Sequence, residues 1–270
     1  MSTSPRVVLT AGHLRSGPVE ALGELLLRQG AQVAGVLAVS VFSPARVRAL
    51  IRQRGPGFLG HAIRRTLGWG THPAAAVGAA AAQPLAEHYA SKSLSINGLR
   101  RFCRAKNVPL AVVPSLNSPA ALALLGRVRP DLVIYGGGGI LRGPFLDAAG
   151  RVLNAHAGPL PAIRGMNAAE WSALLGEPAQ ATVHLIDRGI DTGPVLLRVP
   201  YDRARCRSVD ELRDRAVVAG LEGLLRCVAE GTWNVPGEAS APSTSRQCFV
   251  LAPVLREVLD ARLRASGALP

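Results

Sequence analysis

The stretch "PRVVLTAGHLRSGPVEALGELLLRQGAQVAGVLAVS" (5–40) decides the fold. Its opening residues, 5–12, form a short apolar, β-branched run that ends at a glycine, which is the pattern of a buried strand. Residues 16–30 keep apolar side chains at helical spacing, with a proline in the first turn and a closing glycine. Residues 31–40 are again strand-like. A strand, a helix and a strand in this order predict a parallel sheet covered by helices.

The same alternation continues downstream. "INGLRRFCRAKNVPLAVV" (96–113) and "SPAALALLGRVRPDLVIYGGG" (118–138) each predict a helix that leads into a strand. We expect two further strands at 151–157 and 181–187, with a helix at 168–177 between them. This order favours an α/β fold with an open, mostly parallel, Rossmann-like sheet, in which functional groups gather at the carboxyl ends of strands.

The pattern changes after about residue 200. A helix with capping-box spacing at its start is expected over 208–231, followed by a loop at 237–245 and an amphipathic helix at 252–266. We therefore expect a catalytic domain over 1–200 and a short helical C-terminal extension over 201–270.

Composition limits the class of protein. The chain has 270 residues, of which 48% are hydrophobic, so a large core is expected. No apolar run is long enough for a membrane span, and the N-terminus lacks the apolar stretch of a signal peptide. The four cysteines are widely spaced and form no CxxC pair, which disfavours a metal site and favours reduced thiols in the cytoplasm.

Charge suggests the kind of partner. The net charge of +13 comes almost entirely from arginine, partly because the composition is that of a GC-rich coding sequence. A basic surface favours anionic partners. Nucleic acid is not expected as the main partner, because aromatic residues make up only 4% of the chain and no stacking platform is visible.

The most basic segment is an insertion over about 43–95. Its part "ARVRALIRQRGPGFLGHAIRRTLGWG" carries many arginines and no acidic residue, with apolar residues at helical spacing around a Gly-Pro-Gly break. Either it is a basic amphipathic pair that meets a membrane surface or an anionic substrate, or it is two short helices whose arginines point to water.

Two loops carry the residues that suggest chemistry. In "LNAHAGPLPAIRG" (153–165), Asn154 and His156 are two apart at a strand end, so their side chains face the same way. In "TVHLIDRGIDTG", Asp191 lies in a glycine-bounded loop after another strand. If both strands end on the same edge of the sheet, Asp191 can reach His156.

These two motifs in this order resemble the folate-dependent formyltransferases, a family that includes glycinamide ribonucleotide transformylase, methionyl-tRNA formyltransferase and the sugar N-formyltransferases. "RPDLVIYGGGGIL" (129–141) also fits the strand and loop that precede the motif there. The resemblance implies the formyltransferase fold and a transfer of formyl from 10-formyltetrahydrofolate to an amine, with no metal. It makes Asn154, His156 and Asp191 the expected catalytic residues.

The chemistry explains these residue types. An amine attacks the formyl carbon, so the carbonyl oxygen becomes an oxyanion and the amine must lose a proton. Asn154 offers a neutral N–H donor to that oxygen. His156 can stabilise the same oxygen or carry the proton, and Asp191 can orient the imidazole and favour its cationic form. His184, on the strand before Asp191, is either a buried structural histidine or a support for these three.

The resemblance also places the folate pterin under the glycine-rich loop. The expected contacts are Gly138, Gly139, Ile140, Leu141, Leu153, Ile186 and Asp187. The run of four glycines at 136–139 departs from many family members and is not a dinucleotide-binding GxGxxG motif.

The acceptor is expected at two basic loops. The turn after the first strand, with Gly12 and Arg15, suits a phosphate at a helix N-terminus, although an ordinary turn has the same pattern. Arg164 could clamp an anionic acceptor or simply be an exposed arginine.

The acceptor class follows by elimination within the family. The residues after 200 predict helices and not the β-barrel of methionyl-tRNA formyltransferase. The chain opens on its first strand, without the regulatory domain usual in formyltetrahydrofolate hydrolase, and glycinamide ribonucleotide transformylase lacks the basic insertion. We therefore expect a small, specialised-metabolite or nucleotide-sugar amine or hydroxylamine as acceptor, and a possible homodimer. A hydrolase of the same donor, or a folate- or nucleotide-binding protein without turnover, are the alternatives.

Overall fold

In the computed structural model, the described residues are 4–40, 84–240 and 245–266. Most of the predicted basic insertion at 43–95 therefore lies outside the described residues. Its last part is described and contains the short helix α4 (Pro84–Ser91).

A seven-stranded sheet forms the centre of the molecule, in the order β3-β2-β1-β4-β5-β7-β8. Its strands are β1 (Arg6–Ala11), β2 (Gln32–Val39), β3 (Leu110–Val113), β4 (Leu132–Gly136), β5 (Val152–His156), β7 (Gln180–Leu185) and β8 (Val195–Pro200). The first five strands in this order, β3, β2, β1, β4 and β5, are parallel to one another. β7 is antiparallel to both of its neighbours, β5 and β8. The expected α/β fold with an open, mostly parallel sheet is confirmed.

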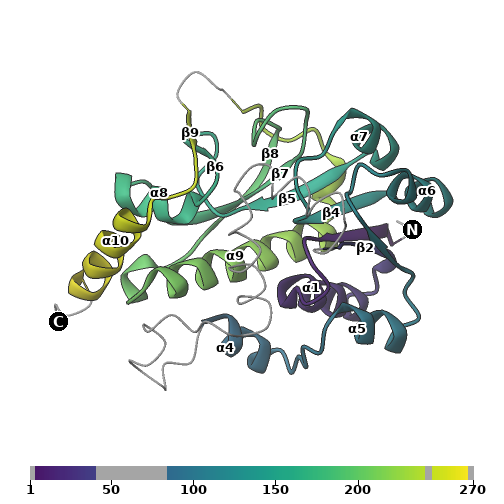
Figure 1. The fold of residues 1–270 in the computed structure, drawn as a ribbon, viewed down its shortest axis with the longest axis horizontal. Helices are drawn as coiled ribbons and strands as arrows, with labels where there is room; N and C mark the ends of the chain where they lie inside the picture. The colour runs from purple at the N-terminus through teal and green to yellow at the C-terminus, as the bar shows by residue number, and fades with distance from the viewer. Residues whose placement is uncertain (1–3, 41–83, 241–244, 267–270) are drawn as a thin grey trace, which may run out of the picture.

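Helices cover both faces of the sheet (Figure 1). One face carries α1 (Gly17–Arg28), α5 (Leu99–Ala105) and the long α9 (Val209–Ala229), whose buried leucines share one apolar core with β1, β2 and β4. The other face carries α6 (Pro119–Val128) and α7 (Gly143–Ala149), which share a second core with the opposite side chains of the same strands. Burial on both faces explains why these strands are continuous apolar runs.

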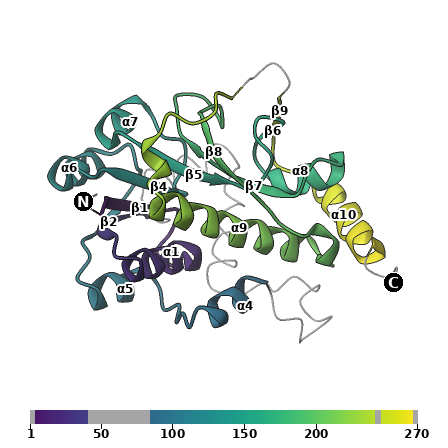
Figure 2. The same ribbon diagram turned by 180° about the vertical axis from the view of Figure 1, so that it is seen from behind.

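The C-terminal extension is helical, as expected, and packs on the sheet. α9 lies across β7 and β8 and is capped by Ser208, whose Oγ accepts a hydrogen bond from the Glu211 N–H at 3.1 Å. α10 (Pro253–Ser266) packs against α9 and α8 (Ala168–Leu175), at the opposite end of the molecule from α6 (Figure 2). The division at residue 200 stays a prediction.

Five helices and strands were not predicted from the sequence: α4, α7, β8, and the strands β6 (Ile163–Gly165) and β9 (Arg246–Cys248). β6 and β9 pair in parallel as a separate small sheet. β6 and β9 are too short to show a periodic pattern. Two short 3-10 turns, Arg203–Arg205 and Thr232–Asn234, complete the described elements.

Candidate active site

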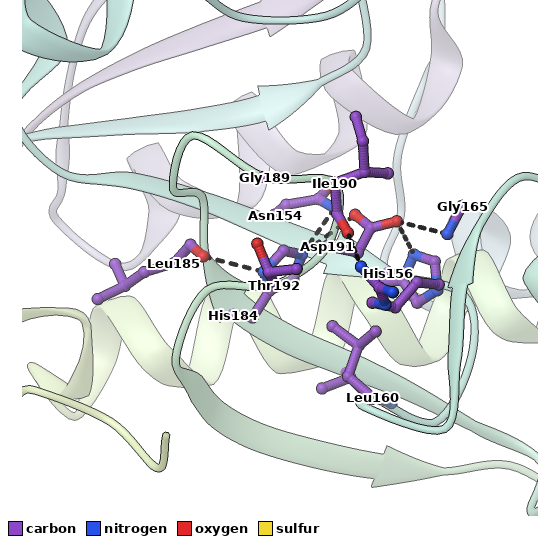
Figure 3. A network of polar contacts seen from close by, with 12 residues as sticks. Asn154, His156, Leu160, Gly165, His184, Leu185, Gly189, Ile190, Asp191 and Thr192 are labelled. Atoms are coloured by element: carbon purple, nitrogen blue, oxygen red, sulfur yellow. Dashed lines mark hydrogen bonds and ion pairs between the residues drawn. The ribbon is translucent and has the colours of Figure 1, made fainter. Parts of the chain in front are cut away.

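Asn154 and His156 lie at the carboxyl end of β5, and their side chains point to the same face of the sheet (Figure 3). His156 is 6% exposed, whereas Asn154 is half-buried and can be reached from outside. Across the strand pair, Asn154 lies opposite His184 and His156 opposite Thr182. The alternation of side chains along β5 thus produces the juxtaposition that the sequence predicted.

Asp191 reaches these residues by a route that differs from the expectation. Because β7 is antiparallel to β5, the two strands do not end on the same edge of the sheet. The loop after β7 instead folds back along β5. The Asp187 carboxylate shapes this loop by accepting hydrogen bonds from the Gly189 N–H at 2.9 Å and the Thr192 hydroxyl at 2.7 Å.

The backbone of the returning loop is tightly fixed. Asp191 has a positive φ of 52°, a conformation that aspartate tolerates better than most residues. A Cβ at Gly193 would overlap the carbonyl oxygen of Leu185, so only glycine fits there. In the sequence "DTG", Asp191 therefore supplies a carboxylate, and Gly193 is needed for the backbone conformation of the loop.

The two ring nitrogens of His156 have different roles: one is held by a hydrogen bond to the backbone, and the other faces Asp191. Its Nε2 lies 2.9 Å from the carbonyl oxygen of Ile163, and because a carbonyl can only accept, Nε2 carries the proton. Its Nδ1 lies 3.4 Å from Oδ2 of Asp191. In the neutral ring Nδ1 therefore holds the lone pair, and a proton gained there is stabilised by the carboxylate.

His184 connects Asn154 to the same carboxylate. Its Nδ1 lies 2.9 Å from the Leu185 carbonyl oxygen and must donate, which leaves Nε2 as an acceptor in the neutral ring. The Asn154 amide nitrogen lies 3.1 Å from this Nε2, and Oδ1 of Asp191 lies 3.7 Å from it. His184 is 1% exposed, so it is the buried, hydrogen-bonded histidine of the expectation and also contacts two of the three predicted catalytic residues.

Burial keeps both imidazoles neutral at neutral pH. It lowers the pKa of His156, against the opposing effects of the Asp191 charge and the hydrogen bond to Ile163. Burial, followed by the charge of His156, lowers the pKa of His184 to about 4, although Asp191 acts in the opposite direction. The two rings meet edge to face with centroids 6.4 Å apart. His156 at rest is thus a base without its extra proton.

Except for Leu153, which lies in β5, the residues predicted to hold the folate lie in the loops after β4 and β7. Gly138 and Gly139 have φ values of 129° and 97°, which glycine alone adopts readily. Leu141 and Ile186 are partly buried against the same core as α7, so the loops after β4 and β7 meet there. A single folate pocket between these loops stays a prediction.

The remaining predicted folate contacts differ in exposure. Ile140 is 71% exposed, and Asp187 is exposed with its carboxylate turned into its own loop. Leu153 is fully buried in the core shared with α1 and α9, so a ligand can meet it only through its backbone.

Two side chains that the sequence did not single out shape the glycine-rich loop. The Tyr135 hydroxyl donates to the Gly139 carbonyl at 2.9 Å. The Asn117 amide donates to the Ile140 carbonyl and accepts from the Arg142 N–H, both at 2.8 Å. No spacing pattern joins Asn117 to this loop, so the sequence carries no signal for it.

The predicted acceptor turn adjoins this loop. A Cβ at Gly12 would lie 3.6 Å from the Gly138 nitrogen, so the turns after β1 and β4 are in contact. Arg15 is exposed, and its N–H donates to Nδ1 of the exposed His13 at 3.2 Å.

Arg164 has partners, unlike the exposed arginine of the alternative expectation. Its Nε donates to the Ser245 hydroxyl at 3.0 Å and its guanidinium also donates to the Ile190 carbonyl at 3.3 Å. It thus lies beside the Asp191 loop.

The comparisons with known proteins agree with this fold. The sequence profile described as formyl transferase matches residues 76–228, more than half of the chain. The chain belongs to the formyl transferase family. The matched region includes the glycine-rich loop, Asn154, His156 and Asp191.

Individual family members are distant. The chain is 30% identical over 153 residues to a methionyl-tRNA formyltransferase of Trichlorobacter lovleyi, covering 56% of this chain and 48% of that protein. It is 33% identical over 148 residues to a phosphoribosylglycinamide formyltransferase of Mycobacterium tuberculosis, covering 49% of this chain and 69% of that protein. The chain spans 40–48% of the length of three methionyl-tRNA formyltransferases that it resembles.

Solved structures share this fold. A sugar N-formyltransferase from a Shewanella species superposes with a TM-score of 0.54 over 96% of this chain and 87% of its own, at 11% identity. At this identity the likeness concerns the fold alone. Among the described residues, no helix is long and apolar enough to cross a membrane.

Proposed function

We propose that this protein transfers the formyl group of 10-formyltetrahydrofolate to a primary amine or hydroxylamine of a small acceptor. The observation that carries the proposal is the contact of His156 Nδ1 with Asp191 Oδ2 at 3.4 Å, beside the half-buried Asn154. A base, its counter-ion and a neutral donor meet at one strand end, as transfer to an amine requires.

The loops after β4 and β7 fit a folate donor. The Gly138 and Gly139 backbone has no side chain to block a flat ring, and Leu141 and Ile186 supply apolar surface at its edge. The Asn117 and Tyr135 hydrogen bonds fix the loop carbonyls before a ligand arrives. The donor, when bound there, supplies the formyl carbon. Ile140, Leu153 and Asp187 stay predicted contacts.

The three side chains divide the work of the transfer. Asn154 donates its second amide N–H to the formyl oxygen, where negative charge develops as the amine attacks. His156 accepts the amine proton at Nδ1, and Asp191 stabilises the imidazolium that results. His156 then returns the proton to N10 of the departing tetrahydrofolate. A bond between the amine nitrogen and the formyl carbon thus forms as the bond between N10 and that carbon breaks.

The acceptor is proposed to be small and anionic, of the specialised-metabolite or nucleotide-sugar class. Gly12 and Arg15 lie at the N-terminal end of α1, next to the proposed folate loop, where backbone N–H groups favour a phosphate. The net charge of +13 favours the same class. The Shewanella neighbour is a sugar N-formyltransferase, which is compatible with this class of acceptor.

Turnover with a defined donor tests this function. The full chain is incubated with 10-formyltetrahydrofolate, with and without a pool of amino sugars, nucleotide-linked amino sugars and hydroxylamines, and tetrahydrofolate formation is followed. We expect amine-dependent release, with mass spectrometry of the product showing one formyl group in place of a hydrogen. Equal release without amine would identify a hydrolase instead. Folate binding without any release would support the binding-protein alternative.

A further inference from the structure

Strand β6 lies between the two predicted catalytic side chains and the C-terminal strand β9. Along one edge of β6, the Ile163 carbonyl accepts from His156 Nε2 at 2.9 Å and the Gly165 N–H donates to Asp191 Oδ2 at 2.8 Å. Three residues of backbone thus fix the orientation of both groups.

The other edge of β6 is occupied by β9. The Arg246 N–H donates to the Ala162 carbonyl at 2.8 Å, and the Met166 N–H donates to the Cys248 carbonyl at 3.0 Å. Backbone groups alternate along a strand, so the groups of Ile163 and Gly165 that hold the site point away from β9. The approach is close, since a Cβ at Gly165 would collide with the Cys248 carbonyl oxygen.

Side chains from β6, from α8 and from the residue that precedes α8 bind the same C-terminal segment, 245–251, at several points. The Arg164 guanidinium donates to Ser245, the Trp171 indole N–H donates to the Phe249 carbonyl at 2.8 Å, and the Asn167 amide oxygen accepts from the Leu251 N–H at 3.0 Å. Arg164 also donates to Ile190, directly before Asp191. The segment is therefore connected to the Asp191 loop as well as to β6.

We propose that β9 is a positioning strand of the active site: its pairing with β6 holds the Ile163 carbonyl and the Gly165 N–H at the places where they orient His156 and Asp191. The role of the site in formyl transfer rests on the proposed function, whereas the effect of β9 on His156 does not. A strand far along the chain, with no side chain in the site, then controls its geometry.

Two neighbouring proline substitutions test this role. Arg246→Pro removes the N–H that bonds to Ala162, whereas Gln247→Pro removes an N–H that points away from β6. Both side chains are exposed, and Arg246→Ala controls for loss of the arginine side chain while keeping its N–H. Thermal unfolding of each variant establishes that it is folded.

The first readout does not depend on turnover. The His156 Nε2 proton, buried and bonded to Ile163, should give a protected imidazole NMR signal in the wild type, in Gln247→Pro and in Arg246→Ala. In Arg246→Pro we expect this proton to exchange faster with water. Equal protection in both folded proline variants would overturn the proposal, even if the wild type transferred no formyl group.

The second readout is kinetic. We expect Arg246→Pro to lower kcat by about tenfold or more with the KM of the donor changed less than about twofold, because a misplaced base slows the chemical step more than binding. Gln247→Pro should stay near the wild-type value. If Arg246→Pro does not fold, Trp171→Phe removes the bond to Phe249 and part of the indole packing beside Ile163 and Cys248, and should change both readouts in the same direction. Wild-type values in Trp171→Phe would then overturn the proposal.

Discussion

The amide nitrogen of Asn154 lies 3.1 Å from Nε2 of His184, and this contact fixes the orientation of the amide. His184 donates through Nδ1 to the Leu185 carbonyl, so Nε2 can only accept in the neutral ring. The amide nitrogen, and not the amide oxygen, must therefore face His184. One N–H remains for a ligand, which makes Asn154 a donor toward the site.

Replacing His184 tests this orientation. His184→Leu removes the acceptor, so the Asn154 amide is free to turn its oxygen toward the site, and we expect kcat to fall by about tenfold. His184→Gln places a carbonyl oxygen near the position of Nε2 and should recover part of the loss. Steady-state kinetics of both variants measure the difference, and equal losses in Leu and Gln would contradict the role of the acceptor atom.

Asn154→Ala removes the proposed donor to the oxyanion. A contact of this kind contributes roughly 3 kcal/mol, so turnover should fall by about 100-fold or more. Donor binding, measured by equilibrium titration with a stable folate analogue, should change little because Asn154 acts mainly on charge that develops during transfer. Unchanged turnover would remove Asn154 from the mechanism.

His156→Ala and Asp191→Asn test the base and its counter-ion. Each should lower turnover by at least about 100-fold, since the proton acceptor or the stabilisation of its charged form is lost. Asparagine is preferred at 191 because it tolerates the φ of 52° that this residue adopts, so the variant changes charge while keeping the loop. Full activity in either variant, with a wild-type circular dichroism spectrum, would disprove the proposed mechanism.

The buried histidines also predict how stability depends on pH. The pKa of His184 is lowered from 6.5 to about 4 by burial. Between these two pH values the histidine is protonated in the unfolded chain but neutral in the folded chain. The contribution of the neutral, buried His184 to the free energy of unfolding is therefore complete above about pH 6.5 and is lost as the pH falls toward about 4. Burial also lowers the pKa of His156, so this residue likewise makes the folded protein less stable as the pH falls.

Urea unfolding at about pH 7.5 and about pH 5 measures this effect. The wild type should lose more stability on acidification than His184→Gln, in which one of the buried imidazoles is absent. An identical loss in the two proteins would show that His184 titrates alike in the folded and unfolded chains.

The sequence predicts the large elements and the three central side chains for a physical reason. In long segments such as 5–40, the spacing of apolar residues shows each strand and helix locally. Asn154 and His156 are brought together by strand geometry alone. The antiparallel direction of β7 could not be predicted in this way. It depends on how the chain returns to the sheet after β5, and residues 180–185 carry no local pattern that indicates it.

The supporting contacts are invisible in the sequence because they join distant segments through the backbone. Gly165 is required by the approach of Cys248, and the Ile163 carbonyl acts whatever its side chain is. Asn117 similarly serves a loop that begins near residue 137. A position whose function resides in its N–H or C=O group carries no residue-type signal for a reader of one sequence.

The proposed acceptor turn gives the final prediction. Arg15 is exposed at the N-terminal end of α1, so Arg15→Ala should raise the KM for an anionic acceptor by about tenfold while kcat changes little, because the charge contributes equally to ground-state and transition-state binding. Inorganic phosphate should inhibit the wild type in competition with the acceptor, and should inhibit Arg15→Ala less. Arg127→Ala, which removes an exposed arginine of α6, is the matched control and should behave as the wild type. An unchanged KM in Arg15→Ala, with phosphate inhibition intact, would place the acceptor's anionic group elsewhere.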